Sequence, residues 1–141
     1  MNEINWRSAL ALATTVVATP MLTWATAARA QKYSPTDGEE IFPGVRLVKL
    51  GSRDSEIPAY KTVFMEDVVF QPKGTIPLGD VMMDDMVCTV TEGELAIKAG
   101  DMDFVAKEGD VWSCAKGSTR ESATNNGTMV AIMRVINLNA A

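Results

Sequence analysis

The fold is decided by residues 86–114, with the sequence MVCTVTEGELAIKAGDMDFVAKEGDVWSC. Short runs rich in Val, Thr, Ile and Leu alternate there with turns built on Gly93, Gly100 and Gly109. Such runs are typical of β-hairpins, because glycine adopts the left-handed backbone that many tight turns need. The segment therefore predicts consecutive antiparallel strands at 86–92, 94–98, 102–107 and 111–114.

Strand-like runs continue on both sides of this segment. Residues 45–51 and 60–70 precede it, and residues 128–137 follow a turn at Asn125-Asn126-Gly127. No stretch after residue 30 carries a sustained helical period. Short strands at regular spacing, with turn residues between them, indicate an all-β sandwich or barrel.

Two glycines, Gly74 and Gly93, bracket a segment in which Asp80, Met82 and Met86 stand at fixed intervals. This spacing resembles the first motif of the cupin superfamily, G-x5-H-x-H-x3-E-x6-G, which implies a jelly-roll β-barrel. Asp80 and Met82 then stand where the motif has its two histidines, and Met86 stands where it has glutamate. The sequence thus has the glycine spacing of the motif, but other residues stand at the positions of the metal ligands.

The second cupin motif, G-x5-P-x-G-x2-H-x3-N, resembles the residues that begin at Gly109. Gly109 and Gly117 match the motif, and Ala115 replaces its proline. Arg120 replaces the histidine, and Thr124 stands for the asparagine. The two motifs imply the fold more strongly than any activity, because one fold hosts many functions.

The residues at the ligand positions are unsuited to a cupin-type iron, manganese or zinc centre. Such a centre needs about three or four imidazole or carboxylate ligands. The sequence contains no histidine, and it offers one carboxylate, Asp80, together with the permanent cation Arg120. A guanidinium repels a divalent ion at short range. We therefore expect a metal-free domain without dioxygenase, oxalate-type or thiol-oxidising chemistry.

The same two charged residues are expected to meet in the barrel mouth. Two ligands of one metal lie close together, so Asp80 and Arg120 would face each other and form an ion pair where the metal stood. The alternative is that both point to solvent, because a register change of one residue turns every side chain of a strand to the other face. The expected ligand pocket, a degenerate metal site, comprises Asp80, Met82, Met86, Arg120, Cys88, Trp112 and Cys114.

Sulfur side chains give the pocket a second interpretation. Met82, Met86 and a cysteine, Cys88 or Cys114, are soft donors suited to Cu(I). The competing interpretation is that methionines at alternate strand positions fill an apolar interior. Trp112 is expected in the core, because alternation places it on the same face as Cys114.

The two cysteines of the chain leave a further choice open. A Cys88–Cys114 disulfide is one possibility in an oxidising compartment. The other is a pair of buried thiols that pack as small apolar side chains. Pairing cannot be deduced from sequence, so both stay open.

The first 30 residues indicate export. Arg7 precedes the uncharged residues 8–28, and Ala28-Arg29-Ala30 fits a signal-peptide cleavage site. The alternative is a retained membrane anchor, since residues 8–28 would form a helix about 31 Å long. Either way the folded part is expected in the periplasm or outside the cell, because Arg7 stays in the cytoplasm. Residues 31–43, with two prolines, are predicted to be a linker or arm, and residues 44–141 the barrel.

Charge and composition narrow the choice of function. The net charge is -5 and no cluster of Lys or Arg is present, which argues against nucleic acid as a partner. The main hypothesis is an exported, non-catalytic module without cofactor that binds a small molecule, with Arg120 as an anchor for an anion, or serves as an accessory subunit of an envelope complex. The alternatives are a lyase, isomerase or hydrolase using Asp80 as base and Arg120 to hold an anion, and the Cu(I)-binding protein. The cupin resemblance also implies a homodimer.

Overall fold

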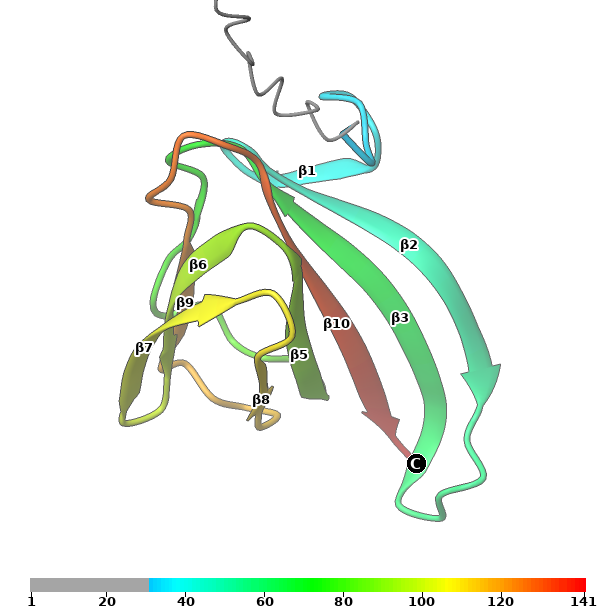
Figure 1. The fold of residues 1–141 in the computed structure, drawn as a ribbon. Helices are drawn as coiled ribbons and strands as arrows, with labels where there is room; N and C mark the ends of the chain where they lie inside the picture. Colours follow the sequence, from blue (N-terminus) through cyan, green and yellow to red (C-terminus); the bar gives the residue numbers. More distant parts are fainter. Residues whose placement is uncertain (1–30) are drawn as a thin grey trace, which may run out of the picture. The chain divides into compact units, whose positions relative to one another are not determined.

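Ten strands and no helix make up residues 31–141, which are the part of the chain that the computed structural model describes. The strands form two sheets (Figure 1). The larger has the spatial order β1 (Glu39–Phe42), β2 (Val45–Asp54), β3 (Tyr60–Phe70), β10 (Ala131–Ala140), β5 (Asp85–Glu92) and β8 (Val111–Cys114). The smaller has the order β4 (Thr75–Ile76), β9 (Glu121–Thr124), β6 (Glu94–Ala99) and β7 (Met102–Lys107).

All strand pairs within the two sheets are antiparallel, so the predicted all-β fold is confirmed. No helix in residues 31–141 has the length and apolar character of a membrane span. The signal or anchor helix expected within residues 1–30 lies outside the described residues and stays a prediction.

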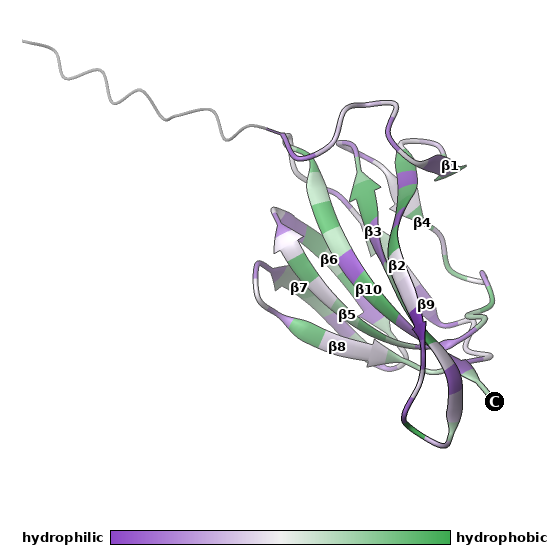
Figure 2. Cartoon of the chain, turned by 90° about the vertical axis from the view of Figure 1, so that its right-hand side faces the viewer, coloured by the Kyte–Doolittle hydropathy of each residue, from purple (hydrophilic) through white to green (hydrophobic). Residues whose placement is uncertain are grey.

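The strands form because apolar and polar residues alternate along them, so that each strand can turn one face inward. In β6, Leu95, Ile97 and Ala99 are buried, and Glu94 is exposed. Figure 2 shows hydrophobic and hydrophilic bands alternating along the strands. The alternation directs one row of side chains from each sheet into a shared interior.

The core takes side chains from both sheets. Val45, Phe70 and Leu95 are fully enclosed, and burial of each contributes about 1.5–3 kcal/mol relative to exposure. The buried cluster consists of Val45, Val68, Phe70, Cys88, Val90, Leu95, Ile97, Ala99, Ala106, Trp112, Cys114, Ala123, Ala131, Met133 and Val135. Trp112 belongs to this core, on the same face as Cys114, as alternation predicted.

The two glycines that bracket the first motif are required by the backbone. The chain passes from β5 in one sheet to β6 in the other at Gly93, where φ is +74° and a Cβ atom would lie 3.1 Å from Ala131. At Gly74 a Cβ atom would lie 2.5 Å from the carbonyl oxygen of Gly44. Any side chain at either position would strain or displace its neighbours. The spacing of these glycines therefore reflects the path of the barrel and carries no chemistry by itself.

Segment 31–43 takes part in the fold as more than a linker. Its residues Glu39–Phe42 form β1, which pairs with β2. β2 also extends to Asp54, beyond the predicted end at residue 51, and the short strand β4 has no counterpart in the prediction.

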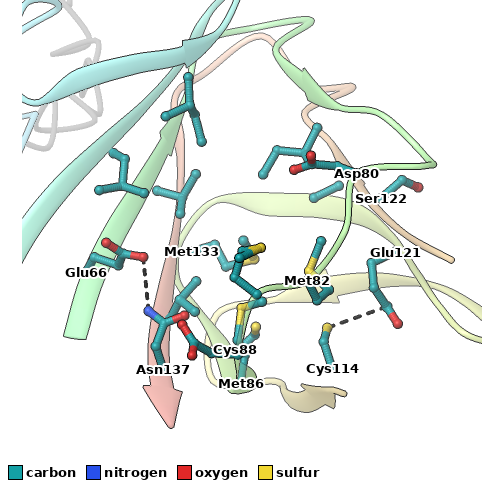
Figure 3. A pocket seen from close by; sticks show the side chains of 18 of the residues that line it. Glu66, Asp80, Met82, Met86, Cys88, Cys114, Glu121, Ser122, Met133 and Asn137 are labelled. Carbon is teal, nitrogen blue, oxygen red and sulfur yellow. Dashed lines mark hydrogen bonds between the residues drawn. The ribbon is translucent and has the colours of Figure 1, made fainter. Parts of the chain in front are cut away.

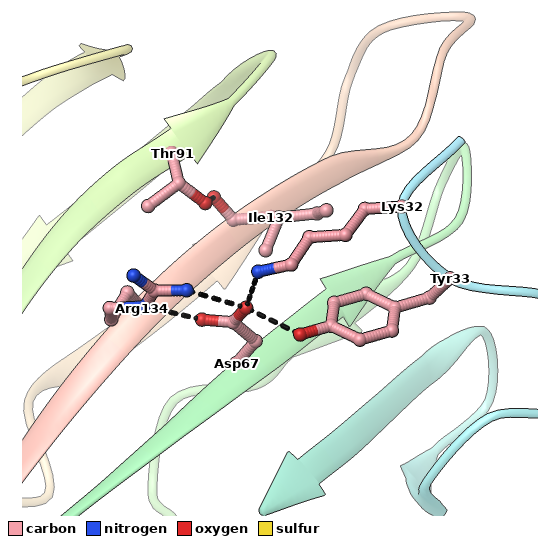
Figure 4. A network of polar contacts seen from close by, with 6 residues as sticks. All are labelled: Lys32, Tyr33, Asp67, Thr91, Ile132 and Arg134. Atoms are coloured by element: carbon pink, nitrogen blue, oxygen red, sulfur yellow. Dashed lines mark hydrogen bonds and ion pairs between the residues drawn. The ribbon is translucent and has the colours of Figure 1, made fainter. Parts of the chain in front are cut away.

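The start of this segment is fixed by a buried carboxylate on β3. Asp67 is fully buried, and its partner across the sheet on β10 is Arg134, whose Nε atom lies 2.8 Å from Asp67 Oδ1. Lys32 Nζ and Tyr33 Oη donate to Asp67 Oδ2 at 2.6 and 2.7 Å (Figure 4). Burial alone would raise the pKa of Asp67, but the donors from Arg134, Lys32 and Tyr33 outweigh it, so the pKa of this carboxyl lies below its usual value.

We expect Asp67→Asn to lower the free energy of unfolding by about 2 kcal/mol at neutral pH, because the charge-assisted hydrogen bonds are lost. Because the folded-state pKa is lowered, this stabilisation is present above the unfolded pKa of about 4 and is lost as the pH falls through the folded value. The loss of stability on acidification should therefore be shallower in the variant than in the parent. Urea unfolding followed by circular dichroism at a series of pH values measures both effects.

The matched control is Asp103→Asn, which removes the exposed ion pair between Asp103 and Lys98. Exposed pairs contribute little, so this variant should unfold at the midpoint of the parent protein. Equal destabilisation by the two substitutions would contradict the role given to Asp67.

Candidate functional site

A cavity of about 360 Å³ lies between the two sheets. Strands of both sheets and the loop before β5 contribute to its wall, which Figure 3 shows from close by. Most of the wall is apolar and consists of Ile41, Phe42, Leu47, Phe64, Val68, Ile76, Val81, Ile97, Trp112, Ala123 and Val135, together with sulfur side chains. The sulfur side chains are Met82, Met83, Met86, Met133, Cys88 and Cys114.

Six of the seven residues expected in the ligand pocket line this cavity, and one does not. Those six are Asp80, Met82, Met86, Cys88, Trp112 and Cys114. The exception is Arg120, which is 58% exposed at its side chain and donates to the Asp101 carboxylate instead. The prediction that Asp80 and Arg120 form an ion pair in the mouth is therefore wrong.

The reason is the alternation of β9. Glu121 and Ala123 are the buried residues of this strand, so the preceding residue, Arg120, faces away from the cavity. The inward position is therefore one residue later than the motif spacing predicts, and a shift of one residue reverses the face of every side chain in a strand.

Glu121 occupies the inward position in place of Arg120. It is 8% exposed and lines the cavity. Its Oε1 atom accepts a hydrogen bond of 2.8 Å from Ser118 Oγ, and its Oε2 atom lies 3.5 Å from Cys114 Sγ. Glu121 was not among the expected site residues, because the motif spacing places the neighbouring Arg120 at the ligand position.

The mouth of the cavity is held by backbone hydrogen bonds between the two motif segments. Gly79 N donates to Thr119 O at 3.0 Å, Met82 N donates to Ser118 O at 2.9 Å, and Gly117 N donates to Met82 O at 2.7 Å. These bonds bind the loop that carries Asp80 and Met82 to the loop before β9. They bring the two motifs together as the cupin pattern implies, although the side chains there differ.

A second polar group of the wall lies on β3 and β10, across the cavity from Glu121 in Figure 3. Asn137 Nδ2 donates to Glu66 Oε1 at 3.0 Å. The pKa of Glu66 is raised, mainly because the carboxyl is buried. The hydrogen bond from Asn137 and the charge of Lys49 oppose this increase, and the nearby charge of Asp84 adds to it. Asp84 is itself 8% exposed.

The two cysteines are free thiols in this structure, which agrees with the buried-thiol alternative and not with the disulfide. Cys88 stands opposite Trp112, and Cys114 stands opposite Met86. The cysteines are thus diagonal neighbours, and diagonal positions are usually about 7–8 Å apart, beyond the usual Cα separation of a disulfide. The thiol of Cys88 interacts with that of Cys114, and this contact, with burial, raises the pKa of Cys88.

We expect both thiols to be inert in the native protein, because Cys88 is 2% exposed and Cys114 is 9% exposed. A chromogenic disulfide reagent at neutral pH should give no reaction with protein purified without reductant. After unfolding in denaturant it should release a signal for both cysteines. Absence of any signal after unfolding would mean that the cysteines are bonded.

The residues of the cavity do not fit a cupin-type metal centre. The sequence has no histidine, and Asp80 is the single carboxylate at the four motif positions. Within residues 31–141, no group of three or more His, Cys, Asp or Glu side chains is arranged to hold a metal ion. An imidazole and carboxylate centre therefore has no donor set here.

Solved structures with the same arrangement of strands include proteins of several kinds. An RmlC-like cupin from Shewanella frigidimarina has a TM-score of 0.59 at 17% identity, over 78% of this chain and 92% of that chain. A sugar phosphate isomerase from a cupin superfamily, from Silicibacter pomeroyi, has a TM-score of 0.55 at 20% identity, over 70% of this chain and 62% of that chain. An oxalate oxidase has a TM-score of 0.56 at 22% identity, over 77% of this chain and 60% of that chain.

These likenesses show that the described part of the chain has the cupin fold, as the motif spacing predicted. No family model matches the sequence, and no curated protein matches it. At these identities the likeness shows the fold alone, and the two activities named among these proteins, an isomerase and an oxidase, differ from each other.

Proposed function

We propose that the chain is an exported binding module that takes a small molecule into the cavity between its sheets. The cavity itself is the main support, because it is preformed, about 360 Å³ in volume and mostly apolar. Ligand pockets in proteins are commonly concave, largely apolar and about 300–1,000 Å³, with a few polar groups that orient the ligand. This cavity lies at the lower end of that range and suits a small ligand.

Two versions of the original hypothesis are not carried forward. An anion held in the cavity by Arg120 is dropped, because Arg120 points away from it and pairs with Asp101. A lyase, isomerase or hydrolase built on Asp80 and Arg120 is dropped for the same reason.

Binding without catalysis is supported by the chemistry of the cavity wall. The sequence contains no imidazole, the side chain that most often serves as a general base near neutral pH. The polar groups of the wall include carboxylates that accept hydrogen bonds from uncharged donors, such as Glu66 from Asn137 and Glu121 from Ser118. Such groups can orient a ligand through hydrogen bonds.

The proposal includes a location. We assign the domain to the periplasm or the outside of the cell, delivered by a signal peptide or anchored through residues 8–28. If the anchor is retained, an accessory role in an envelope complex becomes the natural form of the binding function.

A cavity-filling substitution tests the binding site. We expect Met82→Trp to weaken binding of the neutral apolar dye N-phenyl-1-naphthylamine by about 10-fold or more, because the larger side chain occupies the space of the ligand. Dye fluorescence titrations of the parent and the variant measure the two affinities.

Met102→Trp is the matched control, since Met102 is 55% exposed on β7 and does not line the cavity. It should leave dye affinity unchanged, and so should Arg120→Ala. A parent protein that does not bind the dye, or equal weakening by both tryptophan variants, would refute the binding proposal.

A Cu(I) site is the second candidate, and the position of Arg120 favours it. The cation that would have opposed copper lies outside the cavity, and Met82, Met86, Met133, Cys88 and Cys114 all contribute to one wall. Figure 3 labels these sulfur side chains among those that line the cavity. Thioether and thiolate sulfur are the donors that Cu(I) prefers.

If copper is the ligand, the purified protein should bind one Cu(I) in competition with a chromophoric chelator. Met86→Leu combined with Cys114→Ser should then lower the affinity at least about 10-fold, because two soft donors are removed. Met129→Leu, at a methionine that is 76% exposed, should not change it. Affinity that is insensitive to the double substitution would assign any bound copper to another place.

A further inference from the structure

The charges that line the cavity are almost all of one sign. Four carboxylates line it, from Glu66, Asp80, Asp84 and Glu121. The single cationic side chain in the lining is that of Lys98, and its Nζ atom lies 3.2 Å from the Asp103 carboxylate on β7. The one cationic side chain of the lining is therefore already paired, and carboxylates outnumber cations in the cavity wall.

Glu121 is the most informative of these carboxylates. It is 8% exposed, and its two hydrogen-bond donors, Ser118 Oγ and Cys114 Sγ, are both uncharged. Within residues 31–141, no Lys or Arg forms an ion pair with it. A carboxylate offers about four acceptor sites, so Glu121 has room for a further donor.

Another buried carboxylate, that of Asp67, has its charge balanced by cations of the same chain. Asp67, on the outer face of β3, receives donors from Lys32 and from Arg134. Glu121 has a similar degree of burial but no such cation. A buried carboxylate without a counter-charge is costly, so the missing partner is best supplied from outside the chain.

The surroundings of Glu121 indicate the rest of the ligand. Met82, Met86 and Trp112 line the same cavity, and they present polarisable sulfur and an indole ring. Aromatic faces attract cations, most strongly in the case of Trp, and methionine packs against irregular apolar groups. This environment suits a positive charge on a compact apolar body.

We propose that the ligand is an organic ammonium, with its charged nitrogen against Glu121 and its apolar part among Met82, Met86 and Trp112. This inference rests on the proposed function and names the chemical class of its ligand. A neutral or anionic molecule of the same shape leaves Glu121 without its counter-charge and binds more weakly.

Three probes with the same phenyl group test the proposal on the unmodified protein: 2-phenylethylammonium, 2-phenylethanol and 3-phenylpropionate. Isothermal titration at pH 7 should give an ammonium affinity at least about 10-fold above that of the alcohol, because a charge-assisted hydrogen bond is gained. The carboxylate should bind most weakly, because it meets like charges.

Glu121→Gln then identifies the anchor. The variant should lose the preference for ammonium over alcohol and keep its affinity for the alcohol, because shape is conserved and charge is removed. Glu94→Gln, the same substitution at an exposed residue of β6, should keep the full preference. Circular dichroism shows whether each variant is folded, and the comparison of probes on the parent protein needs no variant.

The outcomes separate this inference from the proposal beneath it. Equal affinity for ammonium and alcohol, while the neutral dye still binds, would overturn the ammonium ligand. A preference for ammonium that survives Glu121→Gln would overturn Glu121 as its anchor. Failure of the neutral dye to bind the parent protein overturns the binding module itself.

Discussion

Three backbone hydrogen bonds between the loop at 79–82 and the loop at 117–119 set the geometry of the cavity mouth. They join two segments that are far apart in the sequence, and they do so without any side chain. Met82 contributes both its N–H and its carbonyl group to this pairing. This backbone frame depends on main-chain contacts and on the space left by Gly74 and Gly93, so it does not depend on which side chains stand at the motif positions.

Much of the fold follows from local pattern. The strands between residues 86 and 114 are predicted closely, because alternation and glycine turns are properties of neighbouring residues. Strands β1 and β4 are missed for different reasons. β1 pairs with the next strand, β2, but its residues Glu39–Phe42 are mostly exposed and show no apolar alternation. β4 has two residues and pairs with β9, far along the chain. The contact of Lys32 with Asp67 also joins residues 35 positions apart, and no local signal announces it.

The candidate site is predicted in composition but not in charge. Met86, Cys88 and Cys114 fall in the cavity because their strands were assigned correctly, with the inward face given by the apolar side chains. Met82 lies in the loop before β5 and was placed by the motif spacing. The inward position was predicted for Arg120 and is occupied by Glu121. The loop after Gly117 fixes the register of β9, and the alternation of residues along a strand does not predict the geometry of the loop before it. A shift of one residue decides whether the side chain that faces the cavity is a cation, Arg120, or an anion, Glu121. The correction of this register therefore changes the expected ligand from an anion to a cation.

Glu66 and Asp67 are consecutive residues of β3 that serve opposite faces of one sheet. Glu66 lines the cavity, and Asp67 secures the arm that begins the folded domain. Deletion of a single residue earlier in β3 would move Asp67 to the inward position of Glu66 and put Val68 in the place of Asp67, which would leave Lys32 and Arg134 without an anion. Over evolution, length changes should therefore accumulate in the loop between β2 and β3, and substitutions alone should be tolerated within β3 itself.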